Sequence, residues 1–425
     1  MRHGVLLAVL LALPAGMPGA AEPPPQHART APGPYPTIAR GRYLTRIADC
    51  KACHTADNGV PFAGQRAVPT PFGTIYSTNI TPDKTTGIGR YSDEDFWRAM
   101  HLGIDRTGRH MYPAFPYQFY SRMSRADVLS IKAYLDTLDP VRMENKPVEL
   151  PWPMSMRWVM KVWNGMYFDP GVYQPDPHKS AQWNRGAYLV QGAGHCAACH
   201  SPKNMLGAPD LDNPLGGGMA ENVFAPNLGN GKRDGLGLWT AADIAEYLHT
   251  GSNRWSAAAG PMAEVVQQST QYLSQADVRA IATYLKDLPK QSDDSGDDEA
   301  PAHHIDEDVM ARGKAVYVDN CEGCHMRDGR GLADVFPPLA DTSAIQAAQA
   351  QTLIEAVLVG AQKPATRARP TGLRMPSFAD KLDDGEIAAV ITYIRNAWGN
   401  HASPASTGDV ANLRSILRNG PPPQS

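Results

Sequence analysis

The chain has 425 residues, of which 42% are hydrophobic and 20% are charged, and its formal net charge is -3. This composition is typical of a globular protein with room for roughly two to four compact domains. The charge is balanced and no strongly basic stretch stands out, so we set nucleic-acid binding aside as a function.

The chain begins "MRHGVLLAVLLALPAGMPGAAEPPP", with a basic start, a short apolar run and small residues at Gly19, Ala20 and Ala21. This pattern is typical of a secretory signal peptide, which we place at residues 1–21. Prolines within and after the run argue against a buried helix. We therefore expect the mature protein to work outside the cytoplasm, where disulfide bonds are permissible.

All six cysteines occur in three C-x-x-C-H motifs, "CKACH" from Cys50, "CAACH" from Cys196 and "CEGCH" from Cys321. Each motif follows a helix-like stretch that opens with Arg-Gly, and each precedes, after a long loop, a segment with apolar residues at helical spacing. The later segments cover residues 124–135, 274–285 and 383–394. The sequence therefore predicts three copies of one unit, a pair of helices that bracket a motif and a loop.

The later helix of each copy opens with an N-cap residue and an acid three positions on, the signature of a capping box. These pairs are Ser124/Asp127, Ser274/Asp277 and Asp383/Glu386. The earlier helices carry Gly41, Gly186 and Gly313, which are small enough to allow a close crossing of the two helices.

Composition sets the expected limits of the units at 36–150, 179–290 and 303–400, followed by a tail at 401–425. The acidic run "QSDDSGDDEAPA" from Gln291 reads as a solvated linker, so we expect the third unit to be joined more loosely than the first two. Between the first two units, residues 152–168 are rich in Trp and Met. We interpret that segment mainly as packing between domains, with a partner-binding surface as the alternative.

The motif spacing decides between three chemistries. A structural zinc site needs four ligands, but whole domains separate the motifs and no second C-x-x-C completes any of them. A thioredoxin-like site needs a strand before the C-x-x-C, and the strand pattern is missing. Haem c accounts for every residue, because two thiols form thioethers to the porphyrin and the next histidine ligates the iron. We expect three haems, held by Cys50, Cys53 and His54, by Cys196, Cys199 and His200, and by Cys321, Cys324 and His325.

One methionine in a proline-containing loop precedes each capped helix, and these are Met111, Met262 and Met375. A thioether opposite imidazole favours reduced iron and leaves no open site for substrate, which suits electron transfer. We expect Met100 and Met123 to be core residues because the other copies have apolar residues there. His110 and His101 are the rival sixth ligands of the first iron.

Several longer stretches, "TPFGTIYSTNITPDKTTGIG", "MYPAFPY", "AAAGPMAEVVQQSTQYLS" and "ITYIRNAWGN", resemble the triheme cytochrome c subunit of membrane-bound periplasmic dehydrogenases. Members serve flavin-dependent gluconate, sorbitol and fructose dehydrogenases and quinoprotein alcohol dehydrogenases. The resemblance implies an all-α fold of three tandem class I cytochrome c-like domains. It also implies His/Met ligation of each iron by the residues named above.

The same resemblance implies an electron-transfer subunit that is not an enzyme by itself. A catalytic FAD or PQQ subunit, accompanied in some complexes by a small third subunit, would supply electrons, and ubiquinone would accept them. The short tail favours the flavin-dependent group, of the gluconate 2-dehydrogenase type. The alternatives are a free-standing multihaem shuttle and a self-contained haem enzyme such as a peroxidase, which needs an iron with an open face.

Beyond the signal peptide, no run approaches the roughly 20 apolar residues that a membrane span needs. We therefore expect peripheral attachment to the periplasmic side of the bacterial cytoplasmic membrane. The stretch "TGDVANLRSILRNGPPPQS" predicts a short helix with an N-cap at Thr407 and a stop at Gly420. Val410, Leu413, Ile416 and Leu417 lie on roughly one face, with Arg414 and Arg418 beside it. This stripe either lies in the headgroup region or packs on the third domain, and residues 152–168 are the next candidate anchor.

Overall fold

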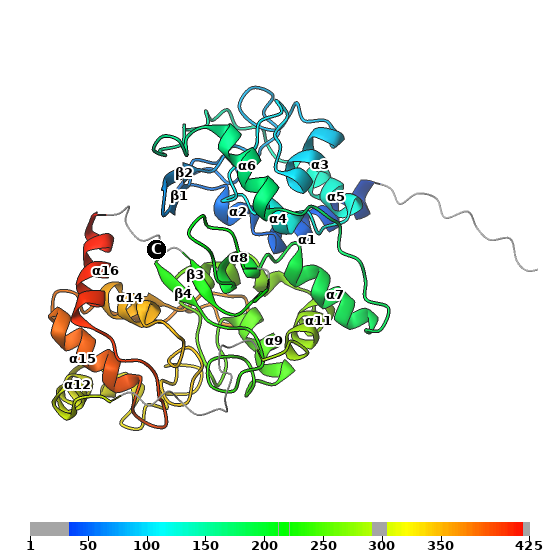
Figure 1. Ribbon diagram of the computed structural model, residues 1–425. Coiled ribbons are helices and arrows are strands. Elements are labelled where there is room, and N and C mark those ends of the chain that lie inside the picture. The colour runs from blue at the N-terminus through cyan, green and yellow to red at the C-terminus, as the bar shows by residue number, and fades with distance from the viewer. Residues whose placement is uncertain (1–33, 211, 221, 291–303, 420–425) are drawn as a thin grey trace, which may run out of the picture.

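The computed structural model describes residues 34–210, 212–220, 222–290 and 304–419, which form three successive helix-rich units (Figure 1). The expected signal peptide at 1–21 and the acidic linker that starts at Gln291 lie outside the described residues. Within the described ranges, no helix combines the length and the apolar character that crossing a bilayer requires.

The first unit places its motif directly after a long helix. Its elements are α1 (Pro34–Ile47), α2 (Cys50–Cys53), β1 (Ala67–Thr70), β2 (Gly73–Tyr76), α3 (Asp93–Leu102), α4 (Tyr117–Tyr120) and α5 (Arg125–Leu135). Helix α6 (Arg157–Tyr167) then leads to the second unit.

The second unit repeats this order, whereas in the third unit the two-stranded sheet follows the middle helix instead of preceding it. The second contains α7 (Ala181–Gln191), α8 (Ala197–His200), β3 (Gly218–Ala220), β4 (Val223–Ala225), α9 (Ala241–Thr250), α10 (Gly260–Gln268), η1 (Thr270–Tyr272) and α11 (Gln275–Lys286). The third contains α12 (Glu307–Asn320), α13 (Glu322–His325), α14 (Gln351–Val359), β5 (Ala361–Gln362), β6 (Arg374–Met375), α15 (Asp384–Ile394) and α16 (Thr407–Asn419).

In every unit two long helices cross at a glycine of the first one. The pairs are α1 with α5, α7 with α11, and α12 with α15. A Cβ atom at Gly41 would lie 1.8 Å from the carbonyl oxygen of Ser130, and one at Gly186 would lie 2.0 Å from that of Ala280. At Gly313 the corresponding distance to the oxygen of Ala389 is 2.2 Å. Because no side chain fits at these distances, the three glycines set how closely the helices approach, which confirms the expectation of a close crossing.

Each unit also contains one two-stranded antiparallel sheet, which the expectation of an all-α fold left out. In the three pairs, Val68 lies opposite Ile75, Met219 opposite Phe224, and Ala361 opposite Met375. The strands are two to four residues long, so the helices still form the framework.

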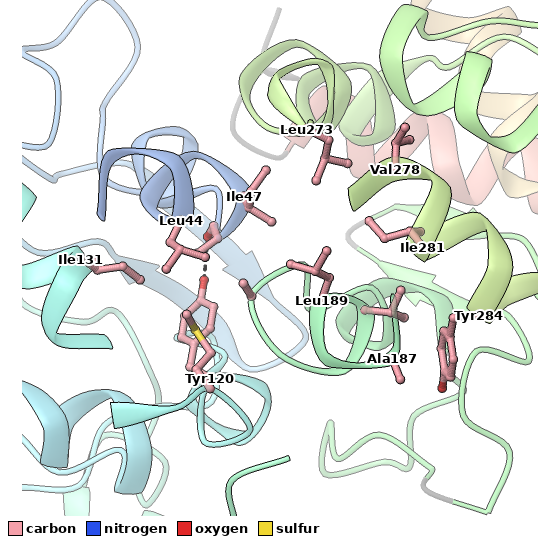
Figure 2. Close-up of a cluster of buried hydrophobic side chains, with 14 of the residues drawn as sticks. Leu44, Ile47, Tyr120, Ile131, Ala187, Leu189, Leu273, Val278, Ile281 and Tyr284 are labelled. Carbon is pink, nitrogen blue, oxygen red and sulfur yellow. Dashed lines mark hydrogen bonds between the residues drawn. The ribbon is translucent and has the colours of Figure 1, made fainter. Parts of the chain in front are cut away.

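The first two units share one core. A single cluster of buried apolar side chains runs from Leu44, Ile47 and Ile131 in the first unit to Leu189 and Val278 in the second. Figure 2 shows these side chains converging from α1 and α5 on one side and from α7 and α11 on the other. The third unit has a separate core of its own, centred on α12, α14 and α15.

Helix α16 packs against α14 and α15 at the edge of the third unit (Figure 1). Val410 and Leu413 are buried there, and Leu417 is half-buried. Arg414 donates hydrogen bonds to Asp384 at 2.7 Å and to the carbonyl oxygen of Ala379 at 2.7 Å. The structure thus supports packing of this stripe rather than exposure to a membrane.

The start of α16 differs from the sequence prediction by one residue. The hydroxyl of Ser406, not Thr407, accepts a hydrogen bond from the amide of Asp409, so Ser406 is the N-cap. The Asp409 carboxylate accepts in return from the Ser406 amide at 3.1 Å, which completes the box. Thr407 is therefore the first residue of the helix and follows the N-cap directly.

Candidate functional site

Each C-x-x-C-H motif folds into a single helical turn directly after the first long helix of its unit. These turns are α2, α8 and α13. The first cysteine of each motif is half-buried, whereas Cys53 and Cys324 are exposed, and no disulfide bond joins any of the six cysteines. One turn of helix brings the two thiols and the following imidazole to one end of the crossed helix pair.

The three motif histidines are oriented in the same way. The Nδ1 atom of His54 lies 2.6 Å from the carbonyl oxygen of Thr78, and that of His200 lies 2.7 Å from the oxygen of Pro226. In the third unit, His325 Nδ1 lies 3.1 Å from the oxygen of Pro337. A carbonyl oxygen can only accept, so the proton is on Nδ1 and the lone pair on Nε2 is free to ligate a metal.

Burial sets the protonation of these groups. It lowers the pKa of His54, His200 and His325 below the ordinary value of 6.5, which keeps each imidazole neutral, the form that binds iron. Burial raises the pKa of the Cys50 and Cys196 thiols to about 12. Thiols of such high pKa are poor nucleophiles, which disfavours disulfide exchange at Cys50 and Cys196.

The carbonyl groups that hold the histidines are functional atoms that the sequence interpretation missed. They lie in matching loops, Thr78-Asn79-Ile80, Pro226-Asn227-Leu228 and Pro337-Pro338-Leu339. In each loop the amide of the third residue donates to a backbone carbonyl oxygen that follows the motif. These bonds run from Ile80 to Phe62 at 2.9 Å, from Leu228 to Leu215 at 2.8 Å and from Leu339 to Gly329 at 2.7 Å. The repeated apolar residue two positions after each carbonyl is the sequence signal that could have located them.

The three candidate methionine ligands are all half-buried. The amide of Met111 donates to the oxygen of Gly103 at 2.7 Å, which fixes its loop against the end of α3. Met262 lies in the first turn of α10 and packs on Ala263 and Val266. Met375 lies in β6 and packs on the core of the third unit. Their ligation of iron stays a prediction.

The competing side chains have other surroundings. Met100 and Met123 are buried in the core, 5% and 0% exposed, which confirms them as packing residues. The Nδ1 atom of His110 lies 3.4 Å from the side-chain Nδ2 atom of Asn164. The ring of His101 stacks on Trp97, with ring centroids 4.3 Å apart. His110 therefore has a polar partner, whereas the buried Nδ1 atom of His101 has no hydrogen-bond partner among the described residues.

Arg66 connects the first motif to the second unit. Its guanidinium donates to the carbonyl oxygen of Ala52, inside the first motif, at 2.7 Å. The same group pairs with both carboxylate oxygens of Glu264, at 2.7 Å for Nη2 to Oε2. Glu264 lies on α10 two residues after Met262, so this one side chain ties the first site to the element that carries a candidate ligand of the second.

The donor set at each site fits haem c. Two thiols one turn apart can form the two thioethers, and the neutral imidazole offers its Nε2 atom to the iron. No disulfide bond joins any of the six cysteines, and a backbone carbonyl holds the Nδ1 atom of each imidazole in place. A bound haem would supply one-electron redox chemistry at each site.

Comparison with known proteins agrees with this geometry. The family model described as cytochrome c matches residues 184–289 and 310–398, which hold the second and third motifs. The gluconate 2-dehydrogenase cytochrome c subunit of Pantoea cypripedii is 40% identical over 393 residues, which cover 89% of each chain. The chain belongs to the family of dehydrogenase cytochrome c subunits.

Other members of this family are nearly as similar over most of their length. The cytochrome c subunit of the quinone alcohol dehydrogenase of Gluconobacter oxydans is 38% identical, over 97% of this chain and 88% of its own. The fructose dehydrogenase cytochrome subunit of Gluconobacter japonicus is 36% identical, over 89% of this chain and 83% of its own. The resemblance inferred from the sequence alone is thereby confirmed.

Proposed function

We propose that the chain is the electron-transfer subunit of a periplasmic dehydrogenase complex and carries three covalently attached haems c. Electrons would enter from a catalytic FAD or PQQ subunit that oxidises an alcohol, polyol or sugar acid, and would leave to ubiquinone in the cytoplasmic membrane. A gluconate 2-dehydrogenase type is our choice of partner, because one relative of that name is 40% identical and aligns over 89% of both chains. Cytochrome subunits of this family transfer electrons and do not themselves catalyse the oxidation.

The observation that carries the proposal is the repeated histidine geometry. Three imidazoles in three units are each held through Nδ1 by a backbone carbonyl, at 2.6, 2.7 and 3.1 Å. Each follows a pair of cysteines that form no disulfide bond. In our proposal the three domains span residues 36–150, 179–290 and 303–400, and Met111, Met262 and Met375 complete the three irons. A His/Met pair leaves no coordination position for substrate, which favours an electron carrier over a peroxidase.

The direct test is a redox experiment on the complex isolated from the membranes of its host. Gluconate should reduce all the haems of the cytochrome, and a short-chain ubiquinone analogue should then oxidise them again. Failure of any alcohol, polyol or sugar acid to reduce the haems, in a preparation in which dithionite reduces them, would contradict the proposed role.

The methionine assignment has its own test. Replacing Met262 by Ala should lower the potential of one haem and leave the other two largely unchanged, since each unit has its own ligands. Met100→Ala is the matched control, because Met100 is buried in the core of the first unit. It should destabilise the fold and leave all three potentials near their original values. Equal spectra and potentials in the Met262→Ala variant and the wild type would refute Met262 as a ligand.

A further inference from the structure

Helix α6, which joins the first two units, is apolar on two opposite faces. On its inner face Met160 and Trp163 are buried against Tyr112 and Ala208. On its outer face Trp158, Val162 and Met166 are 59%, 51% and 56% exposed. Helices at a protein surface normally turn polar residues to the solvent. The outer side of α6 therefore has the composition of a surface that is buried in the working protein.

The exposed apolar surface extends beyond the helix itself. A turn of the second unit is fixed beside α6, because the Nε1 atom of Trp163 donates to the carbonyl oxygen of Leu206 at 3.0 Å. In that turn Met205 is 95% exposed. We define the α6 face as the seven exposed apolar residues of the two segments, Trp152, Met156, Trp158, Val162, Met166, Met205 and Leu206.

We propose that the α6 face inserts into the headgroup layer of a lipid bilayer that contains anionic lipid. The inference rests on the proposed function, which requires contact with the membrane, and it names the surface that makes this contact. Helix α6 lies on the outside of the first unit, away from the third unit (Figure 1). Several of its apolar side chains could therefore enter the bilayer without rearrangement of the core.

The charges of the segment favour lipid over a protein partner. Between Pro151 and Phe168 the charged residues are Arg157 and Lys161, both basic. Lys161 is exposed on the outer face, between Trp158 and Val162. Protein interfaces are depleted in lysine, whereas at a membrane the lysine stem lies among the acyl chains and its ammonium reaches the phosphates. Tryptophan is likewise the side chain preferred at headgroup depth.

The position of the face also suits electron delivery to a lipid-soluble acceptor. Met166 and Phe168 border a hollow of about 590 Å³ whose other side includes Pro202 and Lys203. Pro202 follows His200 by two residues, so the hollow opens beside the second motif. A bilayer at the α6 face would therefore lie next to the second site. By contrast, Val410 and Leu413 of the α16 stripe are already buried against α14 and α15, and Ile416 is the one exposed residue among its four apolar residues.

The test uses the full-length protein with its haems, without the dehydrogenase, in co-sedimentation with vesicles of phosphatidylethanolamine and phosphatidylglycerol. The variant Trp158→Ser/Val162→Ser/Met166→Ser should bind at least about tenfold more weakly than the wild type. A control removes exposed apolar side chains outside the α6 face, with Val309→Ser/Val318→Ser/Leu238→Ser, whose residues are 37%, 47% and 44% exposed. The control should change binding by less than about twofold.

A second variant tests the electrostatic part and leaves the apolar residues in place. Lys161→Gln should weaken binding to vesicles with phosphatidylglycerol by about fivefold and have no effect with phosphatidylcholine alone. Since Lys161 is exposed, this change should not affect folding.

Two results would overturn the proposal. In the first, the triple variant binds vesicles as tightly as the wild type. In the second, the triple variant loses the dehydrogenase that co-purifies with the wild type while neither binds vesicles, which makes the face a protein interface. Reduction of the haems by dithionite is measured in every sample. A failure there concerns the proposed electron-transfer function and is distinguishable from a failure of the α6 face.

Discussion

The junction between the first and second units differs from the junction between the second and third. The first junction has an apolar core, one buried cluster that includes Leu44 and Leu189, in addition to polar contacts. The second is polar: Thr352 exchanges two hydrogen bonds of 2.9 Å with the backbone of Phe224, and Arg369 contacts Glu246 at 2.8 Å. Within the described residues, no buried apolar cluster spans the second junction. One repeated unit is thus joined to its neighbours by two different kinds of contact.

A pair of tyrosines explains part of this difference. Tyr43 of the first unit donates to Asp277 of the second at 2.6 Å, and its hydroxyl accepts from the amide of Ser274 at 3.1 Å. Tyr188 makes the same two contacts in the opposite direction, to Asp127 at 2.6 Å and from Ser124 at 3.1 Å. Each tyrosine lies two residues after the crossing glycine of its own helix.

These contacts change the helix caps that the sequence predicts. In the first two units the N-cap serine accepts from the amide of the acid, but the serine's own amide is taken by the tyrosine of the neighbouring unit. In the third unit Asp383 and Glu386 form a complete capping box by themselves. The third unit has Ala315 where the others have Tyr43 and Tyr188. One position in the repeat therefore decides whether a unit can take part in the exchange.

The largest expected effect comes from closing a helix crossing. Gly186→Ala would place a Cβ 2.0 Å from a backbone oxygen in the shared core and should lower the free energy of unfolding by about 3 kcal/mol. Because that core is continuous, the first and second units should both lose stability in a denaturant titration. Gly313→Ala, in contrast, should destabilise the third unit and leave the transition of the other two in place. Equal effects of both variants on every transition would show that the three units unfold as one.

The tyrosine exchange should contribute less. Replacing both Tyr43 and Tyr188 by Phe keeps the rings and removes four hydrogen bonds, two donated to carboxylates and two accepted from serine amides, so stability should fall by at least about 2 kcal/mol. Unfolding of the first two units, followed by tryptophan fluorescence, measures this loss. Tyr393→Phe in the third unit is the control, since the Tyr393 ring packs on Tyr317 and Trp398 within that unit. A loss below about 0.5 kcal/mol in the double variant would mean that the apolar cluster alone joins the units.

The same exchange predicts a dependence on pH. Burial acts to raise the pKa of Asp277, but hydrogen bonds from Arg185 and Tyr43 outweigh it, and the pKa is lowered from 3.8. A carboxylate with a lowered pKa stabilises the fold fully above 3.8 and loses this contribution as the pH falls through its folded pKa. The first two units should therefore lose stability below about pH 4, and Asp277→Asn should show a flatter profile there. An unchanged profile in the variant would contradict the assignment.

The smallest effect is expected at the second junction. Arg369 contacts Glu246 and Asp334 at 2.8 and 2.6 Å, and such partly exposed pairs contribute about 1 kcal/mol or less. Arg369→Ala should leave the unfolding of the first two units unchanged. It should weaken the attachment of the third unit to the second, more at low salt than at high salt. Small-angle scattering at two salt concentrations measures the change in dimensions. If this variant unfolds the first two units, the second junction is as strong as the first.

The sequence predicts the helix pairs because their signals are local. Apolar periodicity, an N-cap residue and a crossing glycine each act within a few positions, and all three recur in every copy. The haem motifs are equally local, so the candidate Cys and His residues could be named without coordinates. The fate of the α16 stripe could not, because an amphipathic helix has the same pattern whether it packs on a protein or on lipid.

The missed features depend on backbone atoms or on contacts between units. The carbonyl groups that orient His54, His200 and His325 follow them by 24, 26 and 12 residues. A carbonyl has no side-chain signature, and this variable spacing conceals the repeat. Arg66 and Glu264 are 198 positions apart, and Tyr43 and Asp277 are 234 positions apart. Both pairs join different units, so only the docked arrangement of the units reveals them.

Intact mass measurement of the denatured chain, combined with peptide mapping, tests most directly whether three haems c are attached. We expect a mass increase equal to three haems, with one haem on each of the peptides that contain Cys50/Cys53, Cys196/Cys199 and Cys321/Cys324. The peptide with Cys50 is the most informative, because the matched family model begins at residue 184. One or two haems per chain, with an unmodified thiol pair in any of the three peptides, would contradict the account.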